Sequence, residues 1–343
     1  IAISIVIAVL AIIFMRDIAS ALGAEGEMLE DSITYGRLIS LAVPAFILQT
    51  EFQILFATAE RPKMGLYITI AAGITNILLD ALFIIVFSWG LVGAAMATVL
   101  SLCVGGIIPL IYFGRKNSSL LRLTKTKYDG QALLKTITNG SSEFVNHISM
   151  SIVGVLFNIQ LLKYAGVDGV AAYGVIMYVN MIFISVYLGY AVGVAPIISY
   201  HFGAQNYNEL KGLLKKSVVI MGVLSLIMVA SAQLLSKPMS MAFVGYDQEL
   251  MEMTQRALFL FSFSFLFSGV GIFGSSFFTA MNDGLISALI AFMRTLIFQT
   301  GAVFLFPLLW GVDGIWLSVV LAEAMALLVT ILFFINKREK YHY

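Results

Sequence analysis

The stretch Arg115–Gln131, RKNSSLLRLTKTKYDGQ, is a long polar interruption in a sequence that is otherwise nearly continuous hydrocarbon. Long apolar segments lie on both sides of it, and the two sides repeat each other. WGLVG at Trp89–Gly93 recurs 221 residues later as WGVDG from Trp310, and FATAERP from Phe56 recurs in the same register as FFTAMND. The pattern predicts two parallel copies of one unit, joined by this basic linker.

The composition is that of an integral membrane protein. Hydrophobic residues make up 60% of the chain, against about 45–50% in soluble proteins. The apolar runs are long and do not alternate, so they predict membrane helices of about 20 residues rather than barrel strands. We therefore expect an all-α polytopic membrane protein. Its single cysteine, Cys103, excludes an internal disulfide.

Ten membrane helices are expected, four before the linker and six after it. Their limits are set by turn-forming residues, such as the Glu60–Lys63 segment ERPK and Asn282-Asp283-Gly284. The expected spans are 1–15, 34–59, 64–88, 91–114, 134–162, 169–200, 210–235, 253–280, 284–309 and 314–336.

The expected domains are an N-terminal lobe, 1–114, a linker, 115–133, and a C-terminal lobe, 134–343. Four helices and six helices do not form two equal copies. Carrying the repeat backwards places the start of the first copy about 87 residues before Ile1. The chain also opens inside an apolar run, without methionine or a signal peptide. We therefore expect a two-lobed bundle of twelve helices of which ten are present.

The distribution of basic residues predicts the orientation. With both termini on the cytoplasmic face, the cytoplasmic segments hold 14 Lys and Arg and the opposite face holds five. This bias follows the positive-inside rule. The linker and the C-terminus are therefore expected in the cytoplasm.

Charged residues inside the expected spans are costly, and each should face a cavity or a partner. Asp80 follows Asn76 by four residues, so both lie on one helix face. A carboxylate beside an amide carbonyl can hold Na⁺, or take up a proton when burial raises its pKa. The alternative is a structural hydrogen bond to a neighbouring helix.

The other membrane charges have structural alternatives of their own. Glu143 could titrate or meet a cation, or it could be a hydrated carboxylate at the interface, and His147 on the same face is expected to be a satisfied polar residue. Arg294 and Glu323 are expected to compensate each other as a structural ion pair. Glu51 could line a cavity or bond across a helix interface.

Enzyme motifs are absent from the sequence. It contains no HExxH, GxSxG or GxxxxGK[ST] motif, and its three histidines, His147, His201 and His342, are too scattered for a metal cluster. Without a nucleotide-binding loop, transport would be driven by an ion gradient or by the gradient of the substrate. Two six-helix units therefore suggest a secondary transporter that works by alternating access.

Three motifs carry a family resemblance. GVAPIISYHFGAQNYNELKGLLKK at Gly193–Lys216, NILLDALF at Asn76–Phe83 and GLVGAAMATVLS at Gly90–Ser101 resemble the multidrug and toxic compound extrusion (MATE) family over essentially the whole chain. The resemblance implies two six-helix lobes and the export of drugs in exchange for Na⁺ or H⁺.

The resemblance also implies site residues. Asn76, Asp80 and Thr98 resemble the cation site of the N-terminal lobe, whose further aspartate belongs to a first helix that this sequence lacks. Glu143 falls where many members carry a functional acid. The segment Phe263–Ala280 contains no acid, whereas some Na⁺-coupled members have an aspartate there.

The sequence thus favours a cation-coupled exporter of small organic, often cationic, compounds that acts as a monomer in the lipid bilayer, without a cofactor, a metal or a nucleic-acid partner. Two alternatives remain. A lipid-linked glycan flippase would need a cleft rich in cationic residues, and Arg294 is the mid-membrane cation that the sequence offers. A receptor or scaffold without transport would need neither Asp80 nor Glu143.

Overall fold

A computed structural model describes residues 1–21, 26–124 and 129–343. Residues 22–25, and residues 125–128 of the expected linker, lie outside the described part. Every regular element in the described part is a helix, and the chain divides into two compact units, Ile1–Lys127 and Tyr128–Tyr343. The expectation of an all-α membrane protein is confirmed.

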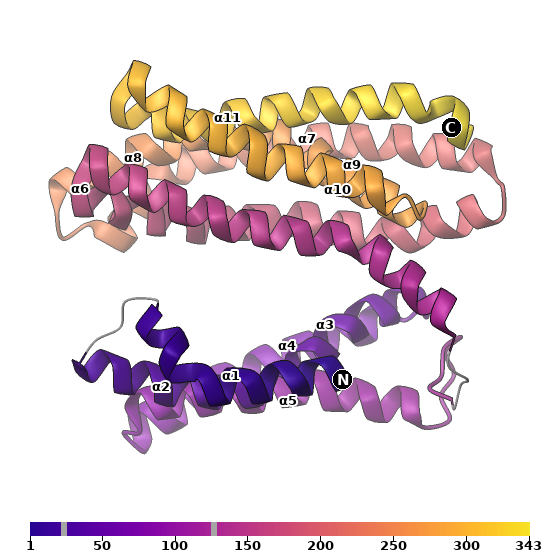
Figure 1. Ribbon diagram of the computed structural model, residues 1–343, viewed down its shortest axis with the longest axis horizontal. Helices are drawn as coiled ribbons and strands as arrows, with labels where there is room; N and C mark the ends of the chain where they lie inside the picture. Colours follow the sequence, from indigo (N-terminus) through magenta and orange to yellow (C-terminus); the bar gives the residue numbers. More distant parts are fainter. Residues whose placement is uncertain (22–25, 125–128) are drawn as a thin grey trace. The chain divides into compact units, whose positions relative to one another are not determined.

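The N-terminal unit is a small bundle in which α3 and α4 both pack against α5 (Figure 1). A bend of 47° separates α2 from α3 at Ala42, ahead of Pro44 in the first turn of α3. The elements are α1 (Ala2–Ala21), α2 (Gly26–Leu41), α3 (Val43–Thr58), α4 (Pro62–Asp80), the π-helix η1 (Ala81–Val86) and α5 (Gly90–Gly114).

The C-terminal unit packs its helices around one apolar core, in which Trp316, Tyr187 and Phe273 are almost fully buried. A second bend, of 51°, separates α8 from α9. The elements are α6 (Gly130–Gly203), α7 (Tyr207–Val244), α8 (Gln248–Ser262), α9 (Phe265–Ala280), α10 (Gly284–Phe292), the π-helix η2 (Met293–Gln299) and α11 (Thr300–Tyr341).

Two of these helices are hairpins that turn at a glycine. Gly166 in α6 has φ 64° and Gly311 in α11 has φ 57°, a backbone conformation that glycine adopts without a steric penalty. The rings of Phe157 and Tyr173 stack at 5.4 Å between centroids, although 16 residues of straight helix would hold them about 24 Å apart. Figure 1 shows α11 doubling back, from orange to yellow.

The membrane spans agree with the expected ones. By length and hydropathy, six helices of the described residues could cross a membrane, or eight if each bent pair counts as one span. Because α6 and α11 each reverse at a glycine, the eight become ten passes. All ten match the expected spans in order, and most of the observed helices extend several residues further at one or both ends.

The internal repeat is visible in the backbone. Gly90 and Gly311, which are 221 residues apart, both begin a helical segment with positive φ, 53° and 57°. The bends at Ala42 and Phe263 are separated by the same interval, and their angles differ by only 4°. Two copies of one backbone pattern therefore lie in the two units.

The C-terminal unit contains a buried ion pair. The Nε atom of Arg294 on η2 lies 3.1 Å from Oε1 of Glu323 on α11, and the two side chains are only 14% and 4% exposed. The second carboxylate oxygen, Oε2 of Glu323, is buried and has no hydrogen-bond partner within the described residues. The expected structural compensation between these two charges is thus observed.

Removing one member of this pair should destabilise the unit strongly, because the other charge is left buried and unpaired. We expect Glu323→Leu or Arg294→Met to cost about 3–5 kcal/mol each, while the double variant Arg294→Met, Glu323→Leu recovers most of that loss. Thermal unfolding of the purified variants in detergent measures this cycle. Additive losses in the double variant would show that the two charges do not compensate each other.

In the N-terminal unit, helices α3 and α5 approach closely at two glycines. A Cβ atom added at Gly106 would lie 2.6 Å from the backbone oxygen of Ala45, and one added at Gly105 would lie 2.4 Å from the amide of Gln49. Small residues at such a crossing are typical of membrane helices, which associate by close packing. The glycine pair therefore sets the distance between α3 and α5.

The variant Gly106→Ala should lower the stability of the N-terminal unit by about 1–3 kcal/mol, because the backbone of Ala45 must move to admit the methyl group. Gly73→Ala is the matched control, since nothing lies within 4 Å of a Cβ atom there. Thermal unfolding should separate the two variants. Equal melting temperatures would contradict the close packing.

Candidate functional site

Helices α4 and α5 bring the predicted cation-site residues to one depth in the N-terminal unit. The two helices pack together and run antiparallel. A Cβ atom on Gly93 would lie 3.0 Å from Cβ of Phe83, and near the other end Thr69 and Gly105 line one cavity. This register places Thr98 opposite the turn that carries Asn76 and Asp80.

The side chains of Asn76, Asp80 and Thr98 keep polar atoms that make no bond to the described residues of the N-terminal unit. Asp80 and Asn76 are half-buried, and in the described part of the chain neither side chain makes a hydrogen bond or an ion pair. The hydroxyl of Thr98 donates to the backbone oxygen of Ala94 at 3.0 Å, which leaves its lone pairs free. The Asp80 carboxylate can thus still take up a proton, and the three side chains together can still hold a cation. Their role stays a prediction.

Asp80 is the last residue of α4, and the π-helix η1 begins at Ala81. Segments of π-helix are rare and often occur at functional sites, because the wider turn disturbs the regular i to i+4 bonding. No sequence pattern indicates this feature, since ALFIIV at Ala81–Val86 is an ordinary apolar run. The most important predicted carboxylate therefore lies where the helix geometry changes.

Glu143 and His147 lie one turn apart on the first half of α6, and both are exposed at the surface of the C-terminal unit. Among the described residues, neither side chain has a hydrogen-bond partner, whereas Asn146 between them accepts a bond of 3.4 Å from Thr295. The Glu143 carboxylate and the His147 imidazole are therefore accessible at the surface of the C-terminal unit. Glu51 is likewise exposed on α3 and makes no bond across a described helix interface.

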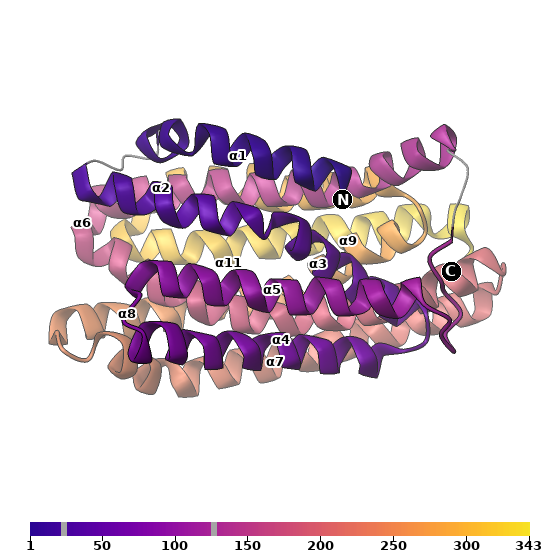
Figure 2. The same cartoon turned by 90° about the horizontal axis from the view of Figure 1, so that it is seen from below.

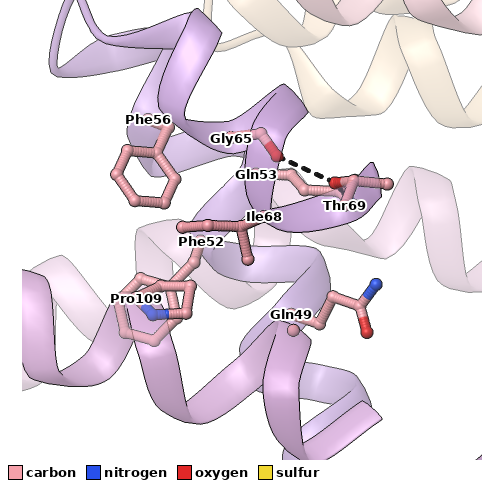
Figure 3. A pocket seen from close by; sticks show the side chains of 9 residues that line it. Gln49, Phe52, Gln53, Phe56, Gly65, Ile68, Thr69 and Pro109 are labelled. Carbon is pink, nitrogen blue, oxygen red and sulfur yellow. Dashed lines mark hydrogen bonds between the residues drawn. The ribbon is translucent and has the colours of Figure 1, made fainter. Parts of the chain in front are cut away.

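A small cavity with both apolar and polar walls lies between α3, α4 and α5 (Figure 3). Nε2 of Gln53 donates to Oγ1 of Thr69 at 3.1 Å, and Thr69 donates to the carbonyl of Gly65 at 2.9 Å. Oε1 of Gln49 is buried without a partner in the described part. The space of about 10 Å³ fits one water molecule and is too small for a drug.

These two amides are not among the predicted site residues. Gln49 and Gln53 are four residues apart in QTEFQ, which places them on one helix face, and this spacing was the available signal. The cavity also adjoins Pro109, which has no N–H group, so the carbonyl of Gly105 lacks its usual helical donor. A water molecule in the cavity could donate to these acceptors.

The fold and the motifs agree with known proteins. The multidrug export protein MepA of Staphylococcus aureus is 25% identical over 342 residues, which cover 99% of this chain and 75% of MepA. MepA of Staphylococcus saprophyticus is 27% identical, covering 98% of this chain and 74% of that protein.

Solved structures show the same fold. The structure described as the outward-facing conformation of a multidrug resistance MATE family transporter superposes with a TM-score of 0.93 at 21% identity, covering 99% of this chain and 77% of that one. A crystal structure of MATE in complex with MaL6 gives a TM-score of 0.94 at 21% identity, with the same coverage.

A family model described as MatE matches residues 1–82 and 144–303, one segment in each compact unit. These matches include Asn76, Asp80 and the Gly193–Lys216 motif, but not Thr98 or Glu143. Members of the family are transporters, not enzymes, in agreement with the missing catalytic motifs. The chain belongs to the MatE family of multi-pass membrane transporters, the multidrug and toxic compound extrusion proteins.

Proposed function

We propose that this protein exports small organic compounds, many of them cationic, across the bacterial inner membrane in exchange for H⁺ or Na⁺. The observation that carries the proposal is the group formed by Asp80, Asn76 and Thr98. Its polar atoms are half-buried in a membrane span and are not bonded to one another. An unpaired carboxylate in a membrane span costs free energy, and an ion-binding role explains why the protein retains one there.

The proposed role of Asp80 is to bind the coupling ion. A carboxylate can change its charge by taking up a proton, or can have its charge screened by Na⁺. Asn76 and Thr98 supply neutral oxygen atoms at the same depth, which can bind Na⁺ or accept a hydrogen bond from the protonated carboxyl group. The amide Nδ2 of Asn76 can donate to the ionised carboxylate. The adjoining π-helix η1 offers a segment whose geometry can respond to the charge on Asp80.

Antiport requires that the ion and the drug favour different states of the protein. A ligand shifts a conformational equilibrium only by its difference in affinity for the two states. If the ion favours one state and the drug the other, each weakens the binding of the other by the same factor. Glu143, exposed on the C-terminal unit, is proposed as a second acid that contributes to this coupling.

The flippase alternative is disfavoured by the state of Arg294. A pyrophosphate-linked substrate needs free cationic groups in the membrane. The Arg294 guanidinium is instead buried and paired with Glu323 at 3.1 Å. Releasing it for a substrate would leave the Glu323 carboxylate buried and unpaired, which is strongly unfavourable.

Substituting Asp80→Asn in cells that express the protein should abolish gradient-driven drug efflux while drug binding is largely retained. The amide keeps the shape and polarity of the carboxyl group but cannot ionise. Dye efflux and dye binding, measured in parallel at equal expression, test this expectation.

Glu27→Gln, an exposed acid in the first turn of α2, is the matched control and should transport normally. Glu143→Gln should have a smaller effect if the N-terminal unit carries the coupling, and a comparable one if both units share it. Efflux at the wild-type rate by Asp80→Asn would show that Asp80 is structural.

A further inference from the structure

A groove lies at the C-terminal end of α5, where the helix leaves its apolar stretch. Its volume is about 520 Å³, within the usual range of ligand sites. One part is lined by the apolar side chains Ile108 and Ile111 and by Tyr112, and the other by the polar segment 115–118. All of these residues belong to the N-terminal unit.

The polar wall of the groove is a loop that hydrogen bonds hold in place. Oδ1 of Asn117 accepts bonds from the backbone N–H and the hydroxyl of Ser119, at 2.9 and 2.6 Å, while its Nδ2 donates to the carbonyl of Tyr112 at 3.2 Å. Arg61, at the turn between α3 and α4, donates to the carbonyl and the hydroxyl of Ser118 at 3.2 and 3.1 Å. These bonds hold the loop against the end of α5.

The cationic side chains of the wall are free to bind a ligand. Arg115 and Lys116 are exposed, and over the described ranges neither side chain makes a hydrogen bond or an ion pair. The turn 60–63 and the segment 115–124 together hold five Lys and Arg but one acid, Glu60. The groove therefore carries a local positive charge that no described carboxylate neutralises.

We propose that this groove binds an anionic phospholipid such as phosphatidylglycerol. Its acyl chain would lie along Ile108 and Ile111, and its phosphate would meet Arg115 and Lys116. The groove joins an apolar wall to a cationic wall where a membrane span ends, which is the chemistry of a lipid with a negative headgroup. A free phosphate ion would use only the polar half.

Basic residues at the ends of membrane helices are common and by themselves set only the orientation. The groove is the feature that distinguishes Arg115 and Lys116 from other exposed basic residues, such as Lys211 and Lys215 on α7. Those two lysines provide a matched control with the same change in net charge.

Native mass spectrometry of the purified chain, with added phosphatidylglycerol or phosphatidylcholine, measures the preference directly. We expect the wild type to retain phosphatidylglycerol selectively. Arg115→Gln, Lys116→Gln should weaken this binding about 30-fold, given the usual contribution of each cationic side chain near a membrane surface. Lys211→Gln, Lys215→Gln should bind like the wild type.

A photoreactive phosphatidylglycerol gives a second test on the unchanged protein, should the variant fail to fold. It should label peptides within 105–122. Labelling confined to other segments, equal retention of the two lipids, or equal losses in the two double variants would each overturn the proposal. Displacement of the lipid by millimolar glycerol phosphate would also overturn it, since the site would then recognise phosphate alone.

Discussion

The hydrocarbon interior of a membrane offers no water to bond with backbone N–H and C=O groups, and the rest of this structure depends on that constraint. Every described regular element is a helix, in which the backbone satisfies itself. Figure 1 shows the helices of each unit running nearly alongside one another, and in the turned view of Figure 2 the long helices keep the same lengthwise course. The reversals at Gly166 and Gly311 use the residue that can take positive φ without strain.

In the membrane interior, the partners of a charged side chain indicate whether its role is structural or functional. Arg294 and Glu323 neutralise each other inside the C-terminal unit, so their presence is explained by packing alone. Asp80 and Asn76 have no such partner in the described part of the chain, although they are half-buried in a span. The contrast separates a structural pair of charges from a candidate ion site, and it does so without reference to the family.

Much of the fold could be predicted from the sequence, because hydropathy and glycine positions report directly on membrane helices. The ten passes and the 221-residue repeat follow from local patterns such as WGLVG at Trp89–Gly93. The bend at Ala42 has a local signal in Pro44. The bend at Phe263 and the π-helix after Asp80 lie in apolar runs without a proline or glycine at the break, so they could not be predicted. The cavity beside Gln49 likewise exists only because α3 crosses α5 at Gly105.

The candidate site was predicted in part. Four-residue spacing placed Asn76 and Asp80 on one face, and the packing of α4 against α5 brings Thr98 to their depth. The surroundings of Glu143 and His147 could not be predicted, since both side chains point out of the C-terminal unit. Their roles depend on groups that a local sequence pattern does not identify.

The central claim is that ion binding at Asp80 opposes drug binding. Isothermal titration calorimetry of the purified protein with a cationic dye tests it most directly. The dissociation constant of the dye is measured over a range of pH and of Na⁺ concentration. Dye affinity should fall as the coupling ion is raised, and Asp80→Asn should bind the dye with an affinity independent of that ion. Dye binding by the wild type that responds to neither ion, or an unchanged ion dependence in Asp80→Asn, would contradict the account.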